Sequence, residues 1–154
     1  AGWTITSGLR KIGGDTSINF TAPEALGAVA NINYRATTPG HLSASSDMEW
    51  TFPAGPTPTT PAELDSWMRN LAQVMPRENR KMRPESFVSR TIGKNKAWSW
   101  LVDFTDNYDQ NRTAYWTAIE SGKSGVRIRF VVPAAKFEAL RPAFDAMIET
   151  LRMP

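Results

Sequence analysis

The sequence predicts a single α+β domain, spanning residues 1–154, in which amphipathic helical segments cover an antiparallel sheet. Two observations carry this prediction: short segments that alternate apolar and polar residues, and amphipathic segments at about 61–75 and 134–152. Consecutive predicted strands with short connections favour an antiparallel meander. Hydrophobic residues make up 41% of the chain and charged residues 21%, which is typical of a folded domain.

The first third reads as short strands. Alternation predicts strands over 3–7, 17–21 and 28–35, and the glycines of 13–15 supply a turn between the first two. In the third strand, Ala30 and its alternate neighbours face away from Val29, so the two sets lie on opposite faces of the sheet.

Two irregular loops are expected at about 37–47 and 53–60, with a short strand or extended edge at 48–52 between them. Both loops are rich in proline, glycine, serine and threonine. Each proline fixes its own φ and disfavours helix in the residue before it. They are internal loops, because the residues before them are too few to form an independent core.

The segment 61–75 is the clearest local prediction of helix. Thr60 is a good N-cap, Pro61 suits the first helical position, and Glu63 completes a capping box. Apolar residues then recur at spacings of three and four, which gives one apolar stripe: Leu64, Trp67, Met68, Leu71, Val74 and Met75.

A run of strands follows, at 86–92, 98–105, 113–120 and 126–132. Apolar residues of the second strand share one face: Trp98, Trp100, Val102 and Phe104. The fourth strand places these residues on one face: Val126, Ile128, Phe130 and Val132. In the third strand Tyr115 and Trp116 point to opposite faces, so one of them is expected to be exposed.

The chain ends in the helical segment 134–152, in which Pro142 is expected to kink or divide the helix. The apolar stripe consists of Phe137, Leu140, Phe144, Met147, Ile148 and Leu151.

Basic residues concentrate between 77 and 96. This segment contains seven basic residues and only two acidic ones, Glu78 and Glu85, so its net charge is +5, whereas the net charge of the whole chain is +3. Such a segment attracts phosphates, anionic lipid or an acidic partner. We predict a partner-binding role for these residues: Arg77, Arg80, Lys81, Arg83, Arg90, Lys94 and Lys96.

Residue content disfavours several chemistries. Without cysteine there is no disulfide, thiolate nucleophile or cysteine-ligated metal. No apolar run of about eighteen residues is present, so no transmembrane segment is expected. His41, the one histidine, has no nucleophile elbow near it. Gly122-Lys123-Ser124 fails as a phosphate-binding loop, because Thr117 stands where its first glycine is required.

The order of elements resembles the PsbP-like fold family. The resemblance rests on an N-terminal strand pair, a helix that precedes three antiparallel strands, and the sheet-to-helix ending. The residues that carry it are Trp3, Ser17-Ile18-Asn19-Phe20, the run from Phe130 to Phe144, and then Ile148, Thr150 and Leu151. The family includes extrinsic proteins of oxygenic photosystems, Ran-binding Mog proteins, and bacterial lipoproteins and secreted proteins. The resemblance implies docking or stabilisation of a larger assembly, and an extracytoplasmic location.

We therefore expect a non-catalytic accessory domain with a protein partner, no cofactor, and no catalytic or metal site. Peripheral association with a membrane complex fits this expectation. Two alternatives remain open. The basic segment and neighbouring aromatics suit single-stranded nucleic acid. A hydrolase would use Asp103 and Glu120 on neighbouring strands; otherwise these carboxylates face solvent or pair with Arg127 or Arg129.

Overall fold

The computed structural model describes residues 4–12, 15–23, 27–36, 41–42, 55–56, 60–63, 65–66, 69, 81–106, 108–121 and 124–151. The long strands are β1 (Thr4–Ile12), β2 (Asp15–Thr21), β3 (Val29–Ala36), β6 (Lys81–Ile92), β7 (Asn95–Thr105), β8 (Asn111–Ser121) and β9 (Ser124–Pro133). The 3-10 turn η3 (Ala134–Lys136) then leads into helix α2 (Phe137–Glu149). The predicted α+β class is confirmed.

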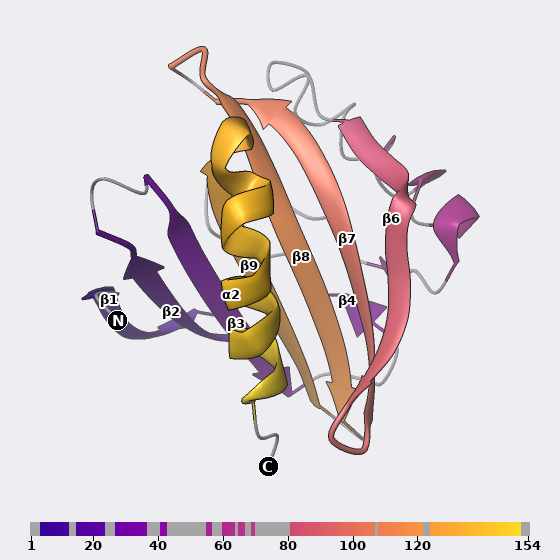
Figure 1. Ribbon diagram of the computed structural model, residues 1–154. Helices are drawn as coiled ribbons and strands as arrows, with labels where there is room; N and C mark the ends of the chain where they lie inside the picture. Colours follow the sequence, from indigo (N-terminus) through magenta and orange to yellow (C-terminus); the bar gives the residue numbers. More distant parts are fainter. Residues whose placement is uncertain are drawn as a thin grey trace.

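The long strands form one sheet in the order β1-β2-β3-β9-β8-β7-β6, and every neighbouring pair is antiparallel. Two meanders therefore make the sheet, one from β1 to β3 and one from β6 to β9. They join where β3 pairs with β9, from Val29 opposite Val131 to Ala36 opposite Ser124. Within the described residues, β1 and β6 are the outermost strands (Figure 1).

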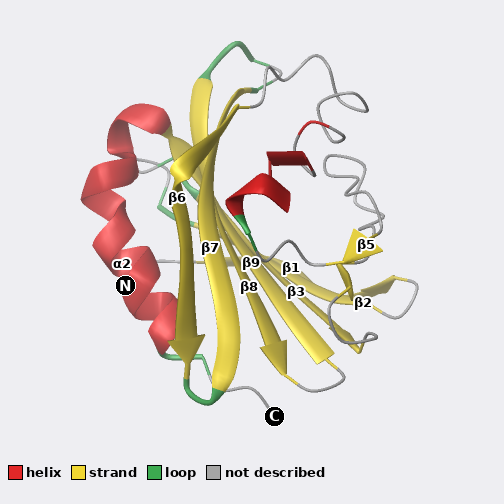
Figure 2. Ribbon diagram, turned by 90° about the vertical axis from the view of Figure 1, so that its right-hand side faces the viewer, coloured by secondary structure: helices red, strands yellow, loops and turns green. Residues whose placement is uncertain are grey.

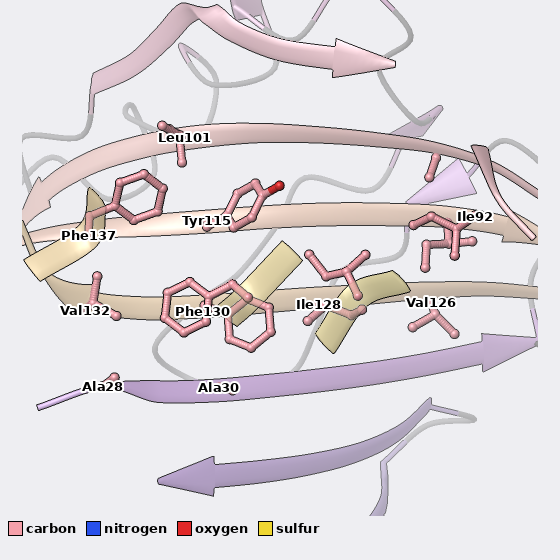
Figure 3. Close-up of a cluster of buried hydrophobic side chains, with 14 of the residues drawn as sticks. Ala28, Ala30, Ile92, Leu101, Tyr115, Val126, Ile128, Phe130, Val132 and Phe137 are labelled. Carbon is pink, nitrogen blue, oxygen red and sulfur yellow. The ribbon is translucent and has the colours of Figure 1, made fainter. Parts of the chain in front are cut away.

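Helix α2 lies across one face of this sheet (Figure 1). Phe137, Phe144 and Ile148 are buried beneath it, and the rings of Phe130 and Phe144 stack with centroids 4.4 Å apart. Figure 3 shows the sheet side of this cluster, in which Phe130 and Ile128 project from β9. The remaining stripe residues pack against the cluster and are partly buried: Leu140, Met147 and Leu151. The predicted stripe is confirmed.

Helix α2 continues through Pro142 and is not divided there. The change from 3-10 to α geometry comes earlier, between Lys136 and Phe137. Pro142 removes the N–H that would bond to the carbonyl of Glu138. Both residues are exposed, so water can satisfy that carbonyl at little cost.

The opposite face of the sheet is also buried, as the row of alternating aromatics predicted. Trp98, Trp100, Val102 and Phe104 are each no more than 6% exposed. The rings of Trp116 and Trp100 stack with centroids 6.1 Å apart, and the Arg129 guanidinium lies 5.6 Å from the centroid of the Trp116 ring. The expectation that Tyr115 or Trp116 would be exposed is wrong, because both faces of β8 are buried.

The N-terminal end of the predicted helix 61–75 is confirmed. Thr60 Oγ1 accepts a hydrogen bond from the Glu63 amide at 3.2 Å, and a Glu63 carboxylate oxygen accepts one from the Thr60 amide at 3.2 Å. This is the reciprocal capping box. The described residues 61–63, 65–66 and 69 are helical and lie on the side of the sheet opposite α2 (Figure 2). The rest of the predicted helix, including its apolar stripe, lies outside the described residues.

Two of the segments expected to be irregular meet each other. Strands β4 (His41–Leu42) and β5 (Gly55–Pro56) form a separate antiparallel pair, with His41 opposite Pro56. The loops at 37–47 and 53–60 are therefore joined by regular pairing at these residues. The predicted strand at 48–52 lies outside the described residues.

The loop between β7 and β8 is held by the carboxylate of Asp106. One of its oxygens accepts hydrogen bonds from the amides of Tyr108 and Gln110 at 2.9 and 3.0 Å, an arrangement typical of an Asx turn. The other oxygen binds Arg112 Nε at 2.8 Å, and Arg112 also reaches the Gly27 carbonyl at 3.1 Å. Burial opposes ionisation, but these hydrogen bonds prevail and lower the pKa of Asp106.

We predict that Phe144→Ala lowers the free energy of unfolding by about 3–5 kcal/mol, because it removes a fully buried ring from the α2 interface. Chemical denaturation followed by circular dichroism measures the change. The exposed neighbour on the same helix, Glu138→Ala, should cost less than about 0.5 kcal/mol. Equal losses would contradict the placement of α2 on the sheet.

Candidate functional site: the basic edge strand

The basic segment forms the edge strand β6 and its turn into β7. Strand β6 begins at Lys81, five residues before the predicted start at 86. Five of the seven predicted binding residues belong to it or to the following turn and strand: Lys81, Arg83, Arg90, Lys94 and Lys96. Arg77 and Arg80 lie outside the described residues.

Register sorts these side chains between the two faces. Ala97 and Leu101 of β7 belong to the cluster beneath α2, so odd positions of β7 face the helix. Arg90 lies opposite Ala97 and Arg83 opposite Leu101, and cross-strand partners share a face. Lys96 occupies an even position of β7 and therefore belongs to the opposite face.

Arg83 is engaged in a structural ion pair. Its Nε and Nη2 donate to the two Asp103 oxygens at 2.7 and 2.9 Å, which is the bidentate geometry that guanidinium favours. The Thr113 hydroxyl donates to the same carboxylate at 2.7 Å. The hydrogen bonds to Asp103 outweigh burial and raise the pKa of Arg83. Arg83 thus joins β6 to β7.

Ser86 closes an irregularity in β6 where the register shifts between Arg83 and Val88. Its hydroxyl donates to the Arg83 carbonyl at 2.5 Å and accepts the Leu101 amide at 2.8 Å. The side chain replaces the ladder partner that the bulge removes, so it links β6 to β7 between the two paired stretches 81–83 and 88–92.

Arg90 ties the edge of the sheet to helix α2. Its guanidinium donates to Asp145 Oδ1 at 3.1 and 3.2 Å and to the hydroxyl of Tyr115. The Tyr115 hydroxyl donates to the same Asp145 oxygen at 2.6 Å. Burial and the hydrogen bond to Asp145 raise the pKa of Tyr115. Three elements, β6, β8 and α2, thereby meet in one polar cluster.

The three lysines differ from the two arginines in exposure and in ion pairing. Lys81, Lys94 and Lys96 are exposed, and none forms an ion pair with another residue in the described part of the chain. Lys81 begins the 12-residue strand β6 and Lys94 lies in the turn after it, so they stand roughly 40 Å apart. Exposed cations therefore flank the edge of the sheet at both ends.

The structure separates the carboxylates of the hydrolase alternative. Asp103 lies opposite Thr113, whereas Glu120 lies opposite Lys96, seven residues further along β8. At about 3.3 Å per residue they are roughly 23 Å apart, too far for two catalytic carboxyl groups to share one glycosidic bond. The across-sheet partner of Asp103 is Arg83, not Arg127 or Arg129.

The described residues offer two further negative findings. They contain no group of three or more His, Cys, Asp or Glu side chains placed to hold a metal ion. None of their helices combines the length and the apolar character needed to cross a bilayer.

Sequence reasoning missed the roles of Asp145 and Tyr115. Both looked like ordinary positions, one on the polar side of a helix and one in an alternating strand. An available signal was the position of Asp145 one residue after Phe144, which places it at the border of the apolar stripe. Its arginine partner is 55 residues away in the chain, and no local pattern indicates that distance.

The sequence matches no protein-family model and no curated protein. A solved structure with a similar fold is PA94 of Pseudomonas aeruginosa, described as a protein of unknown function and putative regulator. It is 12% identical with a TM-score of 0.57, and the match covers 100% of this chain and 99% of PA94. At this identity the likeness establishes the fold alone.

Two further structures are more distant. A Bacteroides thetaiotaomicron protein is 15% identical with a TM-score of 0.45, and the match covers 89% of this chain and 38% of that protein. LpqN of Mycobacterium tuberculosis, described as involved in cell envelope biogenesis, is 11% identical with a TM-score of 0.39. The match covers 90% of this chain and 64% of LpqN.

We predict that Arg90→Gln lowers the free energy of unfolding by about 1–3 kcal/mol, because the partly buried Asp145 carboxylate loses its nearer cation and keeps only Arg141 at 3.8 Å. The matched change Lys94→Gln removes one positive charge from an exposed turn and should cost less than about 0.5 kcal/mol. Urea unfolding of both variants measures the difference. A larger loss in the lysine variant would overturn the division into structural arginines and free lysines.

Alkaline pH should destabilise the protein partly through Tyr115. The ordinary pKa of tyrosine is 10.0 and the folded-state pKa of Tyr115 is raised, so the unfolded chain releases this proton first. The contribution is complete below pH 10 and is lost as the pH rises through the folded-state pKa. Tyr115→Phe should flatten the fall in stability above pH 10, measured by denaturation at stepped pH. Tyr108→Phe, at an 83% exposed position, is the control, and an unchanged slope in Tyr115→Phe would refute the assignment.

Proposed function

We propose that this protein is a non-catalytic accessory domain that binds an acidic surface of a protein partner through the edge strand β6 and its turn into β7. The observation that carries the proposal is the set of exposed lysines at the two ends of that edge, at positions 81, 94 and 96. Arg83 and Arg90 hold β6 in place, so the lysines project from a fixed support. A rigid support reduces the conformational entropy lost on binding.

The electrostatics of such a surface favour association with anionic partners. Exposed charges at a rim raise the association rate and make it dependent on salt, while contributing modestly to affinity. This matches a reversible accessory interaction. It also makes a direct demand: the complex must weaken as ionic strength rises.

Resemblance to the PsbP-like family supports the accessory role and an extracytoplasmic location, and both are part of the proposal. Family members act mainly by docking onto or stabilising larger assemblies. The segments 37–47 and 53–60 belong to the proposed contact region as well, because β4 and β5 bring them together at His41 and Pro56.

The single-stranded nucleic-acid alternative needs exposed aromatic rings beside the basic segment. The aromatic rings of β7 and β8 beside it are each at most 6% exposed: Trp98, Trp100, Phe104, Tyr115 and Trp116. This burial is the reason to favour a protein partner, and nucleic acid becomes an outcome of the test below.

Capture from an extract of the source organism tests the proposal. We expect one protein to co-purify in a defined ratio, and the triple change K81Q/K94Q/K96Q to weaken its binding about tenfold at low salt. The matched control K11Q/K123Q/K136Q removes the same net charge outside the basic segment and should bind as the wild type does. Loss of binding only in the control set, or co-purification of nucleic acid alone, would refute the proposed function.

A further inference from the structure

Strand β6 is the outermost strand on its side of the sheet formed by the described residues, and its second half, Val88–Ile92, is regular. We propose that this half-strand is a docking edge, to which an extended segment of a protein partner adds by main-chain hydrogen bonds. The inference deepens the proposed function and rests on it: it assigns the binding mode and the chemistry of the partner segment. Figure 1 shows this part of β6 running down to the β6–β7 turn.

The turn geometry identifies the backbone groups that face outward. Ile92 lies opposite Asn95 across the two-residue loop Gly93-Lys94, and Gly93 has φ +61°, as the first position of a type II′ turn requires. Residues that flank a two-residue hairpin loop exchange hydrogen bonds with each other. By alternation Val88, Arg90 and Ile92 bond to β7. The N–H and C=O groups of Ser89 and Thr91 then point away from the sheet.

A separate contact supports the same assignment of which backbone groups of β6 face β7 and which face outward. The Leu101 amide points towards β6, where the Ser86 hydroxyl accepts it at 2.8 Å. Leu101 is an odd residue of β7, as are Ala97 and Ser99, which lie opposite Arg90 and Val88. Odd residues of β7 therefore direct their amides towards β6, which agrees with the turn geometry.

The half-strand lacks the devices that block edge pairing. Val88 is 44% exposed, Ser89 and Thr91 are exposed, and the segment contains no proline. Its charged residue, Arg90, is directed to Asp145 of α2. In the described part of the chain, the backbone of residues 88–92 bonds only to β7. An edge of this kind is a template for another strand.

The other edges contrast with it. The first half of β6 carries exposed Pro84 and Glu85 and the bulge between Arg83 and Val88, all of which hinder pairing. Strand β1 has two register irregularities between Ile5 and Arg10, which break its regular ladder. Proline, charge and register irregularities thus protect the other edges, whereas within the described residues no strand pairs with the outer side of 88–92.

The charges beside this edge define the segment that fits it. Lys94 and Lys96 are exposed at the end where β6 turns into β7. A partner strand of alternating β-branched and polar residues suits the main-chain edge and Val88. A carboxylate on that strand, near the β6–β7 turn, pairs with the two lysines.

Amide hydrogen exchange of the full chain, read by NMR, tests the proposal with synthetic peptides. The probe is a nine-residue peptide of alternating threonine and valine with glutamate at both ends. Two control peptides have the same side chains but carry methyl groups on alternate backbone nitrogens. One is methylated at the odd positions and the other at the even positions, so in one of them the N–H groups that would face β6 are blocked. In the free protein Arg90 and Ile92 should be protected, while Ser89 and Thr91 exchange freely. The unmethylated peptide, at millimolar concentration, should slow exchange at Ser89 and Thr91 at least about tenfold.

Three outcomes would overturn the docking edge. The first is the absence of new protection with the unmethylated peptide, and the second is equal protection by both methylated versions, which indicates charge attraction alone. The third is protection of Ser89 and Thr91 in the free protein that rises with its concentration, which assigns the edge to a second copy.

The variant S89P/T91P separates this inference from the proposed function. It removes the two outward N–H groups while leaving the β7 ladder intact, and a circular-dichroism melt verifies its fold. The docking edge predicts that it loses the captured partner while keeping all three lysines. If it retains the partner and K81Q/K94Q/K96Q does not, the proposed function stands and the docking edge fails.

Discussion

The pairing of β3 with β9 is the constraint on which the rest of the structure depends. Eight consecutive residue pairs join a meander near the start of the chain to one near its end. Strand β9 thereby becomes central, with Ile128 and Phe130 buried on the α2 face and Val131 buried on the other. Because β9 is occupied on both sides, the second meander extends outward and leaves β6 at the far edge of the sheet.

An edge strand has a hydrogen-bonded neighbour on one side only, so side-chain contacts add to its stability. Here two arginines provide the additional links: Arg83 to Asp103 within the sheet, and Arg90 to Asp145 on α2. The cost of bringing these charges into partly buried positions is offset by the bidentate Arg83–Asp103 contact, by the two hydrogen bonds from Arg90 to Asp145, and by the hydroxyls of Thr113 and Tyr115. The described part of the basic segment therefore divides in two, since Arg83 and Arg90 stabilise the fold whereas Lys81, Lys94 and Lys96 are exposed.

Local patterns allowed much of the fold to be predicted. The capping box at Thr60, the apolar face around Trp100 and the stripe of α2 are confirmed, because each depends on spacings of two to four residues. What failed depended on register or long-range pairing. Tyr115 is buried together with its neighbour because both faces of the sheet are covered, and Asp103 finds its cation 20 residues away. Alternation gives the face of a side chain, but not its cross-strand partner.

Lysine footprinting tests the central claim, that the lysines of the basic edge form the contact with a protein partner. The free protein and its complex are acetylated under limiting reagent, and modification at each lysine is quantified by mass spectrometry. The account predicts rapid modification of Lys81, Lys94 and Lys96 in the free protein and strong protection of these lysines in the complex. Lys136 should react equally in both. Unchanged reactivity of the three edge lysines in the complex would contradict the account.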